Sequence, residues 1–104
     1  MPDHEIVSEK LDAIETELKQ IGFWRTEPLP PHMFQFTQAF AMDTMPFACW
    51  LQFIFIPRVR TLIEERGPFP ATSMIAAQAI REFDGQNEAG RLITLLSDFD
   101  ALFS

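Results

Sequence analysis

Apolar residues recur at helical spacing near the start of the chain. Val7, Leu11, Ile14 and Leu18 follow one another at intervals of four, three and four residues, and charged residues fill most of the positions between them. This spacing places the apolar side chains on one face of a helix. The pattern predicts an amphipathic helix over residues 3–21.

A second apolar segment is nearly uniform. Between Pro46 and Pro57 the only polar residue is Gln52, and apolar residues continue as far as Ile63. A short buried strand is one interpretation of such a run, but its length favours a helix over residues 45–65. A helix that is apolar on all sides is typically buried on all sides. We therefore expect a central helix, kinked at the second proline because that residue lacks a backbone N–H.

Two further helices are predicted in the second half of the chain, about residues 72–83 and 88–103. No hairpin signal accompanies them, so the fold class expected is all-α, a small four-helix bundle in a single domain of residues 1–104. Three prolines interrupt residues 22–45, which excludes a continuous helix there. Five large aromatic residues lie in the same segment, namely Phe23, Trp24, Phe34, Phe36 and Phe40. We interpret it as a long ordered loop between the first two helices; it either covers the core or frames a binding groove.

Composition limits the classes of partner. The formal net charge is −7, which opposes direct binding to nucleic acid or to anionic membrane surfaces. The longest apolar run is about half of the ~20 residues that a membrane-spanning helix needs, and the N-terminus lacks the apolar region of a secretory signal. Cys49 is the single cysteine and cannot form an internal disulfide. We therefore expect a cytoplasmic protein.

Candidate catalytic chemistry is sparse. His4 and His32 are isolated from other metal-ligating residues, so no metal site and no cofactor are expected. Cys49 lies in an apolar segment, where burial raises a thiol pKa and suppresses the nucleophilic thiolate. The carboxylate pairs are one or two residues apart on predicted helices and point in different directions. We assign no catalytic residue.

Arg58 is the most informative charged residue. On a helix it shares a face with Phe47, Leu51 and Ile54, where an unpaired charge is unfavourable. We predict an ion pair with Asp43, from the turn before the helix. The alternative is that Arg58 faces a pocket and holds an anion or a partner's carboxylate.

Several motifs together resemble the YqcC-like family of small uncharacterised bacterial proteins: "TQAF" at 37–40, "MDTM" at 42–45, "WLQFIFIPR" at 50–58 and "LLSDFDALF" at 95–103. Departures from the family pattern occur at Ala39, at Cys49, where an acidic residue is common, and near Ala76. The resemblance implies a four-helix fold and a gene neighbouring that of a tRNA pseudouridine synthase. It does not make this chain such a synthase, because the chain is too short and too acidic.

Two functions remain open. The first is a non-catalytic interaction protein or accessory factor with an unidentified protein partner, for which a tRNA-modifying enzyme is one candidate; a homodimer is another way to cover excess apolar surface. The second is a binder of a small molecule or anion, or a minor enzyme, with a pocket between the Pro57-kinked helix and the aromatic loop. The candidate binding residues are Trp24, Phe36, Phe40, Asp43, Gln52 and Arg58.

Overall fold

The computed structural model describes residues 3–103, and within this range the chain is helical with no strand. One long rod consists of α2 (Phe47–Trp50), a single π-helical turn (Leu51–Phe55) and α3 (Ile56–Glu64). The other three helices are α1 (His4–Gln20), α4 (Ile75–Glu82) and α5 (Gly90–Ala101). Single 3-10 turns occur at Pro31–Phe34, Ala39–Ala41 and Asn87–Ala89. The predicted all-α class with four helices is confirmed.

The first helix forms where its periodicity predicts. The Asp3 side chain accepts a hydrogen bond from the Glu5 N–H at 2.9 Å, which caps the helix start. At the other end Gly22 adopts a φ of +79°, the left-handed conformation that glycine adopts without strain. The buried face carries the predicted apolar stripe, together with Glu17.

Pro57 is accommodated by the π-helical turn. Proline cannot donate to the carbonyl four residues before it, and its ring crowds that carbonyl in a regular α-helix. The turn directly before it is wider: the Ile56 N–H donates to the Leu51 carbonyl, five residues away. Residues 47–56 are almost entirely buried, but Pro57, Arg58 and Thr61 are exposed. The prediction that this helix is buried on all sides is therefore wrong for α3, which has one flank in water.

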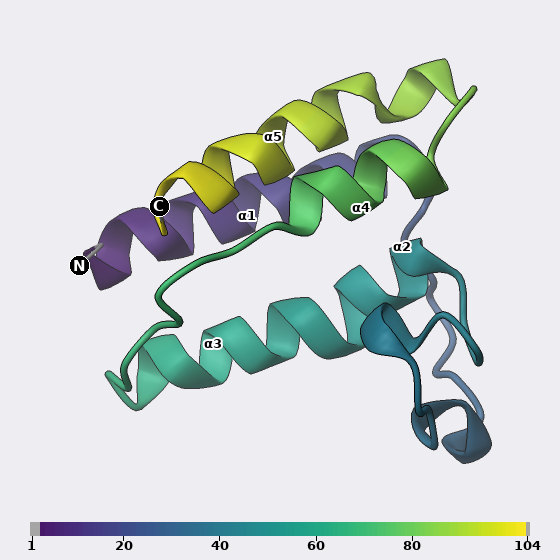
Figure 1. The fold of residues 1–104 in the computed structure, drawn as a ribbon, viewed down its shortest axis with the longest axis horizontal. Coiled ribbons are helices and arrows are strands. Elements are labelled where there is room, and N and C mark those ends of the chain that lie inside the picture. The colour runs from purple at the N-terminus through teal and green to yellow at the C-terminus, as the bar shows by residue number, and fades with distance from the viewer. Residues whose placement is uncertain (1–2, 104) are drawn as a thin grey trace.

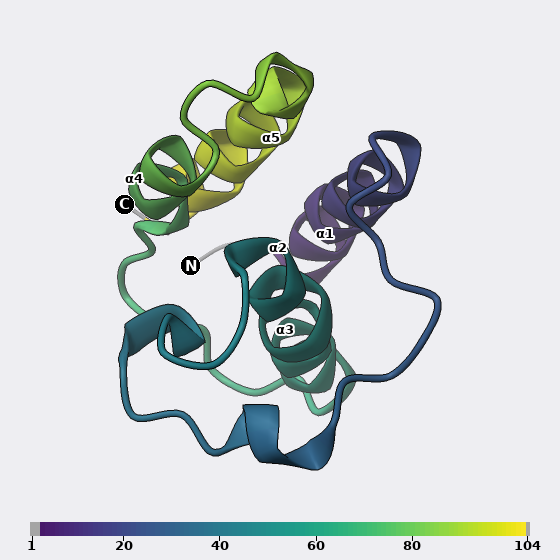
Figure 2. The same ribbon diagram turned by 90° about the vertical axis from the view of Figure 1, so that its right-hand side faces the viewer.

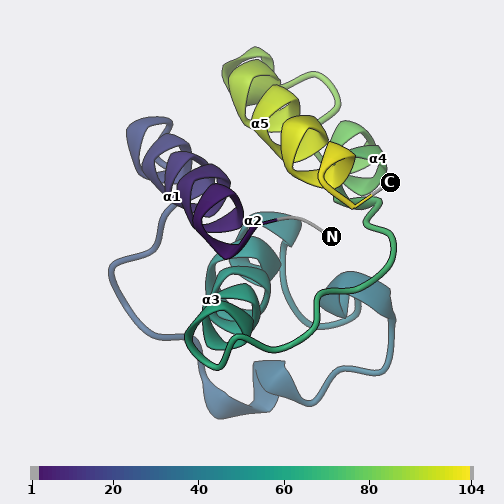
Figure 3. The same ribbon diagram turned by 90° about the vertical axis from the view of Figure 1, so that its left-hand side faces the viewer.

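The helices lie in two levels: the rod forms one level, and α1, α4 and α5 form the other (Figure 1). α1 packs against both α5 and α3, and α4 packs against α5 (Figure 1). The start of α1 and the end of α5 lie at the same end of the molecule (Figure 1). Seen from either end, the loop between α1 and α2 winds around the side of α3 that faces away from α1 and α5 (Figures 2 and 3).

The aromatic side chains join these elements in a connected series of ring contacts. Trp50 stacks on Phe55 at a centroid separation of 5.6 Å, and Phe55 meets Phe99 of α5 edge-on at 5.1 Å. Phe99 in turn contacts Phe103 at 5.0 Å. Most of the phenylalanine content is therefore core, in which edge-to-face and offset ring contacts stabilise the packing of α5 against the central rod.

Candidate functional site

A cavity of about 340 Å³ lies where α3, α5, the start of α4 and the segment of residues 65–74 meet. Its lining is mainly aromatic and aliphatic, and the polar side chains in it are Arg58 and Ser73: Trp50, Phe55, Arg58, Val59, Leu62, Phe69, Pro70, Ser73, Ile75, Phe99 and Phe103. A concave apolar site with few polar groups is the usual form of a small-molecule site. This cavity is therefore the first candidate site.

The turn after α3 directs the chain back over the cavity. The Gly67 N–H donates to the Leu62 carbonyl at 2.9 Å, and the Arg66 N–H donates to the Ile63 carbonyl at 3.2 Å. This pair of bonds closes the helix end, with Arg66 in the left-handed conformation at a φ of +50°. The following residues cross from α3 toward α4 and form one wall of the cavity.

Phe69 fixes that wall from two sides. Its ring lies 4.7 Å from the His4 ring of α1 and 5.6 Å from the Phe103 ring. The His4 Nε2 also lies 3.3 Å from the Gly67 carbonyl oxygen. The start of α1 and the residue Phe103 after α5 thus hold the wall against the core.

Asp100 of α5 fixes the other end of the same segment. Its carboxylate accepts the Ser73 hydroxyl at 2.5 Å, the Ile75 N–H at 3.1 Å and the Ala76 N–H at 2.8 Å. These N–H groups belong to the first turn of α4, where no residue of α4 itself supplies a side-chain cap. A carboxylate from a neighbouring helix therefore performs the capping function.

Arg58 lies at the mouth of the cavity, because its side chain both lines the cavity and is exposed to solvent. The predicted ion pair with Asp43 is wrong. Asp43 instead accepts the Thr37 N–H and hydroxyl, each at 3.0 Å, and the Gln38 N–H at 3.3 Å. These hydrogen bonds, that of the Thr37 N–H first, hold the pKa of Asp43 below its ordinary value.

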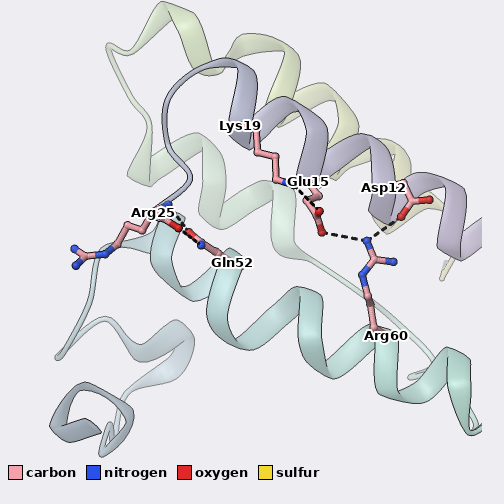
Figure 4. Close-up of polar contacts among 6 residues, drawn as sticks. All are labelled: Asp12, Glu15, Lys19, Arg25, Gln52 and Arg60. Carbon is pink, nitrogen blue, oxygen red and sulfur yellow. Dashed lines mark hydrogen bonds and ion pairs between the residues drawn. The ribbon is translucent and has the colours of Figure 1, made fainter. Parts of the chain in front are cut away.

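Gln52 is buried and binds the backbone of the loop. Its Oε1 accepts the Arg25 N–H and its Nε2 donates to the Arg25 carbonyl, both at 2.8 Å (Figure 4). Both ends of the side-chain amide are therefore used within the protein. The one polar residue of the apolar run connects the central rod to the loop.

Three aromatic candidates lie along the loop, half-buried. Trp24 has the Lys19 ammonium 4.9 Å from its ring centroid. Phe40 packs edge-on against Trp50 at 4.9 Å, and Phe36 lies against the core. None of the three lines the 340 Å³ cavity, which is walled by residues 65–74 rather than by the aromatic loop. The expected position of the pocket therefore needs correction, and among the six predicted residues only Arg58 lies in this cavity.

A second candidate site is a pair of exposed methionines beside α4 that the sequence analysis did not identify. The Gln78 side-chain amide of α4 donates to the Met42 sulfur at 3.5 Å, which places the loop methionine on α4. Met74 directly precedes α4, four residues before Gln78, and the two methionines are 50% and 74% exposed. We call Met42, Met74 and Gln78 the methionine patch. The sequence contains a signal for this site, because Met74 is an apolar residue outside the buried stripe that contains Ile75 and Ala79.

The charged groups of α1 and α3 form a separate network. Arg60 donates to Asp12 at 2.8 Å and to Glu15 at 3.1 Å, and Lys19 donates to Glu15 at 3.0 Å (Figure 4). Burial by itself raises the pKa of Glu15, but the hydrogen bonds from Lys19 and Arg60 outweigh it and the pKa falls below its ordinary value. This network joins two helices.

Other site chemistry is limited in the described part of the chain. Burial raises the pKa of the Cys49 thiol, as expected for a core residue. Among residues 3–103, no three histidine, cysteine, aspartate or glutamate side chains are grouped so that they could hold a metal ion. In the same range, none of the helices combines the length and the apolarity required to cross a bilayer.

Comparison with known proteins identifies the family. The family model DUF446, described as "tRNA pseudouridine synthase C", matches residues 6–102. The protein named "Uncharacterized protein YqcC" from Escherichia coli (strain K12) is 34% identical over 105 residues, which cover 100% of this chain and 96% of that protein. The chain belongs to the YqcC family. The resemblance inferred from the sequence motifs is thereby confirmed.

The fold of the YqcC family is also known from experiment. The solution NMR structure of YqcC from E. coli is similar to this structure with a TM-score of 0.86 at 33% identity, covering 99% of this chain and 89% of that chain. An uncharacterised protein of Haemophilus influenzae is 33% identical over 95 residues, which are 88% of this chain and 87% of that protein.

The match to a longer relative covers only part of that protein. The protein named "tRNA pseudouridine synthase C" from Pectobacterium carotovorum subsp. carotovorum is 26% identical over 98 residues. The matched region is 94% of this chain but only 26% of that protein. About three quarters of the longer protein therefore has no counterpart in this YqcC family chain.

Proposed function

We propose that this protein is a non-catalytic accessory factor that acts in the cytoplasm by binding a tRNA-modifying enzyme of the pseudouridine synthase class. The observation that carries the proposal is the Pectobacterium relative, in which a region matching nearly this whole chain occupies about a quarter of a protein named as such a synthase. Joining two modules in one chain raises the effective concentration of each for the other. Fusion into one chain is therefore advantageous for two modules that also bind each other as separate proteins.

The proposal treats residues 1–104 as one domain, a small four-helix bundle with an ordered Pro/Phe-rich loop.

Charge supports an enzyme rather than RNA as the direct partner. The net charge of −7 opposes RNA, whereas an enzyme that binds tRNA typically exposes a basic surface. Complementary charge would steer association between the two proteins. The accessory factor then contacts tRNA only through its partner.

The methionine patch is the proposed centre of the contact surface. Methionine side chains are flexible and polarizable and adapt to apolar partner surfaces, which is why such residues recur at binding surfaces. Met42 belongs to the same loop as the half-buried Phe36 and Phe40, which we include in the proposed contact surface. Trp24 and Arg58 remain predicted border residues of this surface.

The test is a binding measurement between the purified protein and the tRNA pseudouridine synthase of the same organism, by calorimetry and by size exclusion with light scattering. The double variant Met42→Glu, Met74→Glu should weaken the complex at least tenfold. Ile80→Glu is the matched control, since Ile80 is an exposed apolar residue, 59% accessible, on a different side of α4. It should leave the affinity unchanged.

Two results would overturn the proposal. The first is no complex at low salt with the unmodified proteins. The second is a dimer of this chain that the double variant dissociates, because the patch would then serve self-association. Equal weakening by the double variant and by the Ile80 control would retain the partner but reject the methionine patch as the contact surface.

A further inference from the structure

The cavity bounded by α3, α5 and residues 65–74 combines an apolar interior with a single cation at its mouth. Its walls are aromatic and aliphatic side chains, and within the described range of residues 3–103 Arg58 is the one cationic residue in the lining. A void among such side chains is unfavourable, because the lining atoms lack packing partners on one side. A ligand with a hydrophobic body would supply those contacts.

The size of the cavity limits the ligand. At ~30 Å³ for each water molecule of liquid, 340 Å³ corresponds to about eleven molecules of that size, or a ligand of about ten to twelve non-hydrogen atoms. The volume also falls within the range of known small-molecule sites. A peptide or a nucleotide would exceed it, whereas an aromatic or medium-chain organic molecule would fit.

Arg58 specifies the charge of the ligand. Within residues 3–103 no carboxylate lies within ion-pair distance of it, whereas Arg60, two residues later, is held by Asp12 and Glu15. The guanidinium of Arg58 is therefore available at the mouth of the cavity. One guanidinium matches one carboxylate in both charge and geometry, since its N–H groups can donate to both carboxylate oxygens.

The other polar groups near the cavity do not favour a second anionic group. The Ser73 hydroxyl donates to Asp100, and the Asp100 carboxylate is directed at the N–H groups of Ile75 and Ala76. Among residues 3–103 no second cation lines the cavity, so a phosphate with two charges would be incompletely neutralised. A monocarboxylate is the ligand class that these groups match.

We propose that this cavity binds a small organic acid, with the hydrophobic body in the apolar interior and the carboxylate paired with Arg58. This proposal does not rest on the proposed accessory function. The two sites adjoin, because Met74 lies between the lining residues Ser73 and Ile75 and Arg58 is also a predicted border residue of the contact surface. The ligand titration uses the protein without a partner, so its failure is distinguishable from failure of the partner-binding test.

The experiment titrates the full-length protein with 3-phenylpropanoate and with decanoate while amide NMR spectra are recorded. Binding should shift the amide signals of residues that line the cavity, including Val59, Phe69 and Phe99. The matched alcohols 3-phenylpropanol and decanol have the same hydrophobic body without the charge. They should bind at least about tenfold more weakly, which is the effect of losing a charge-assisted hydrogen bond.

Three variants test the role of the arginine. Arg58→Gln should lower the affinity for the acids at least about tenfold and leave the affinity for the alcohols unchanged. Arg58→Lys should give an intermediate loss, because it keeps the charge but not the two-pronged geometry. Arg81→Gln removes an equally exposed cation on α4 outside the cavity lining and should have no effect.

The proposal is overturned if neither acid binds at millimolar concentration, or if the acids and alcohols bind equally well. It is also overturned if the shifted signals lie outside the cavity lining, or if Arg58→Gln and Arg81→Gln reduce affinity equally. The comparison of acids with alcohols uses the unmodified protein, so it decides the question even where a variant folds poorly.

Discussion

The side-chain amide of Gln52 holds the backbone of Arg25 at both its N–H and its carbonyl, with both distances 2.8 Å. The two residues are 27 positions apart, and Gln52 is only 7% exposed. This pair of hydrogen bonds fixes the chain just after α1 to the central rod. It also explains why a single polar residue lies within an otherwise apolar run: the loop backbone that crosses there has two groups to satisfy.

Removing the Gln52 amide should destabilise the protein. We expect Gln52→Leu to lower the free energy of unfolding by about 1–3 kcal/mol, because the N–H and carbonyl of Arg25 lose their partners. Gln52→Glu keeps an acceptor for the Arg25 N–H but buries a carboxylate against the Arg25 carbonyl, so it should cost at least as much. Urea unfolding gives the free energies, and the amide exchange rate of Arg25 should rise in Gln52→Leu. The control is Gln20→Leu, an exposed position at the end of α1; a cost as large there would contradict the assignment.

The capping of α4 by Asp100 leads to a second prediction about stability. We expect Asp100→Ala to lower the free energy of unfolding by about 1–2 kcal/mol, the usual effect of losing a helix N-terminal cap. Asp100→Asn keeps one acceptor oxygen and should lose about half as much. Asp98→Ala, an exposed carboxylate on the same helix, should stay within about 0.5 kcal/mol of the original protein. Chemical denaturation of the three variants measures the difference, and similar losses for Asp98 and Asp100 would exclude the capping role.

Arg66 has a positive φ at the end of α3, where glycine is the favoured residue type. We expect Arg66→Gly to raise the free energy of unfolding by about 0.5–1 kcal/mol, because a side chain in the left-handed region is strained. Arg66→Val should lower it, since β-branching makes this conformation worse. Arg81→Gly, within α4, should instead destabilise by up to about 1 kcal/mol. Thermal and urea unfolding distinguish these signs, and a loss of stability in Arg66→Gly would show that the turn is unstrained.

The Glu15 network predicts a pH dependence. The pKa of Glu15 lies below its ordinary value because hydrogen bonds from Lys19 and Arg60 outweigh the effect of burial. A lowered pKa contributes stability that is present above the unfolded-state value, about 4.3, and is lost as the pH falls through the lower native value. Stability should therefore decline below about pH 5.

Arg60→Gln tests this dependence. It removes one of the two cations that lower the pKa of Glu15. Urea midpoints measured between about pH 6 and pH 3 should fall less steeply in this variant. Arg81→Gln is the control for the loss of a surface cation, since no ion pair joins Arg81 to another residue within residues 3–103, and its pH profile should match that of the original protein. Parallel profiles for Arg60→Gln and the original protein would mean that the network does not contribute to acid stability.

Local pattern determined the helices of this protein. The stripe from Val7 to Leu18 specifies α1, because a helical repeat can be read from neighbouring positions alone. The apolar run that contains Gln52 specifies a buried central helix, and Pro57 marks its irregularity, since the missing N–H is a property of the residue itself. The family was likewise readable, because its motifs are short stretches of consecutive residues.

Partners that are distant in sequence were decided only by the tertiary structure. Asp43 satisfies N–H groups five and six residues away instead of Arg58, because a short loop closes at less entropic cost than a long one. The cavity is walled by residues 65–74 because the turn at Arg66 directs them there and Asp100 holds their far end. Met42 lies against Gln78 because the loop crosses α4 there. A one-dimensional pattern gives the face of each helix, but it does not say which loop crosses that face, and the candidate sites of this protein depend on those crossings.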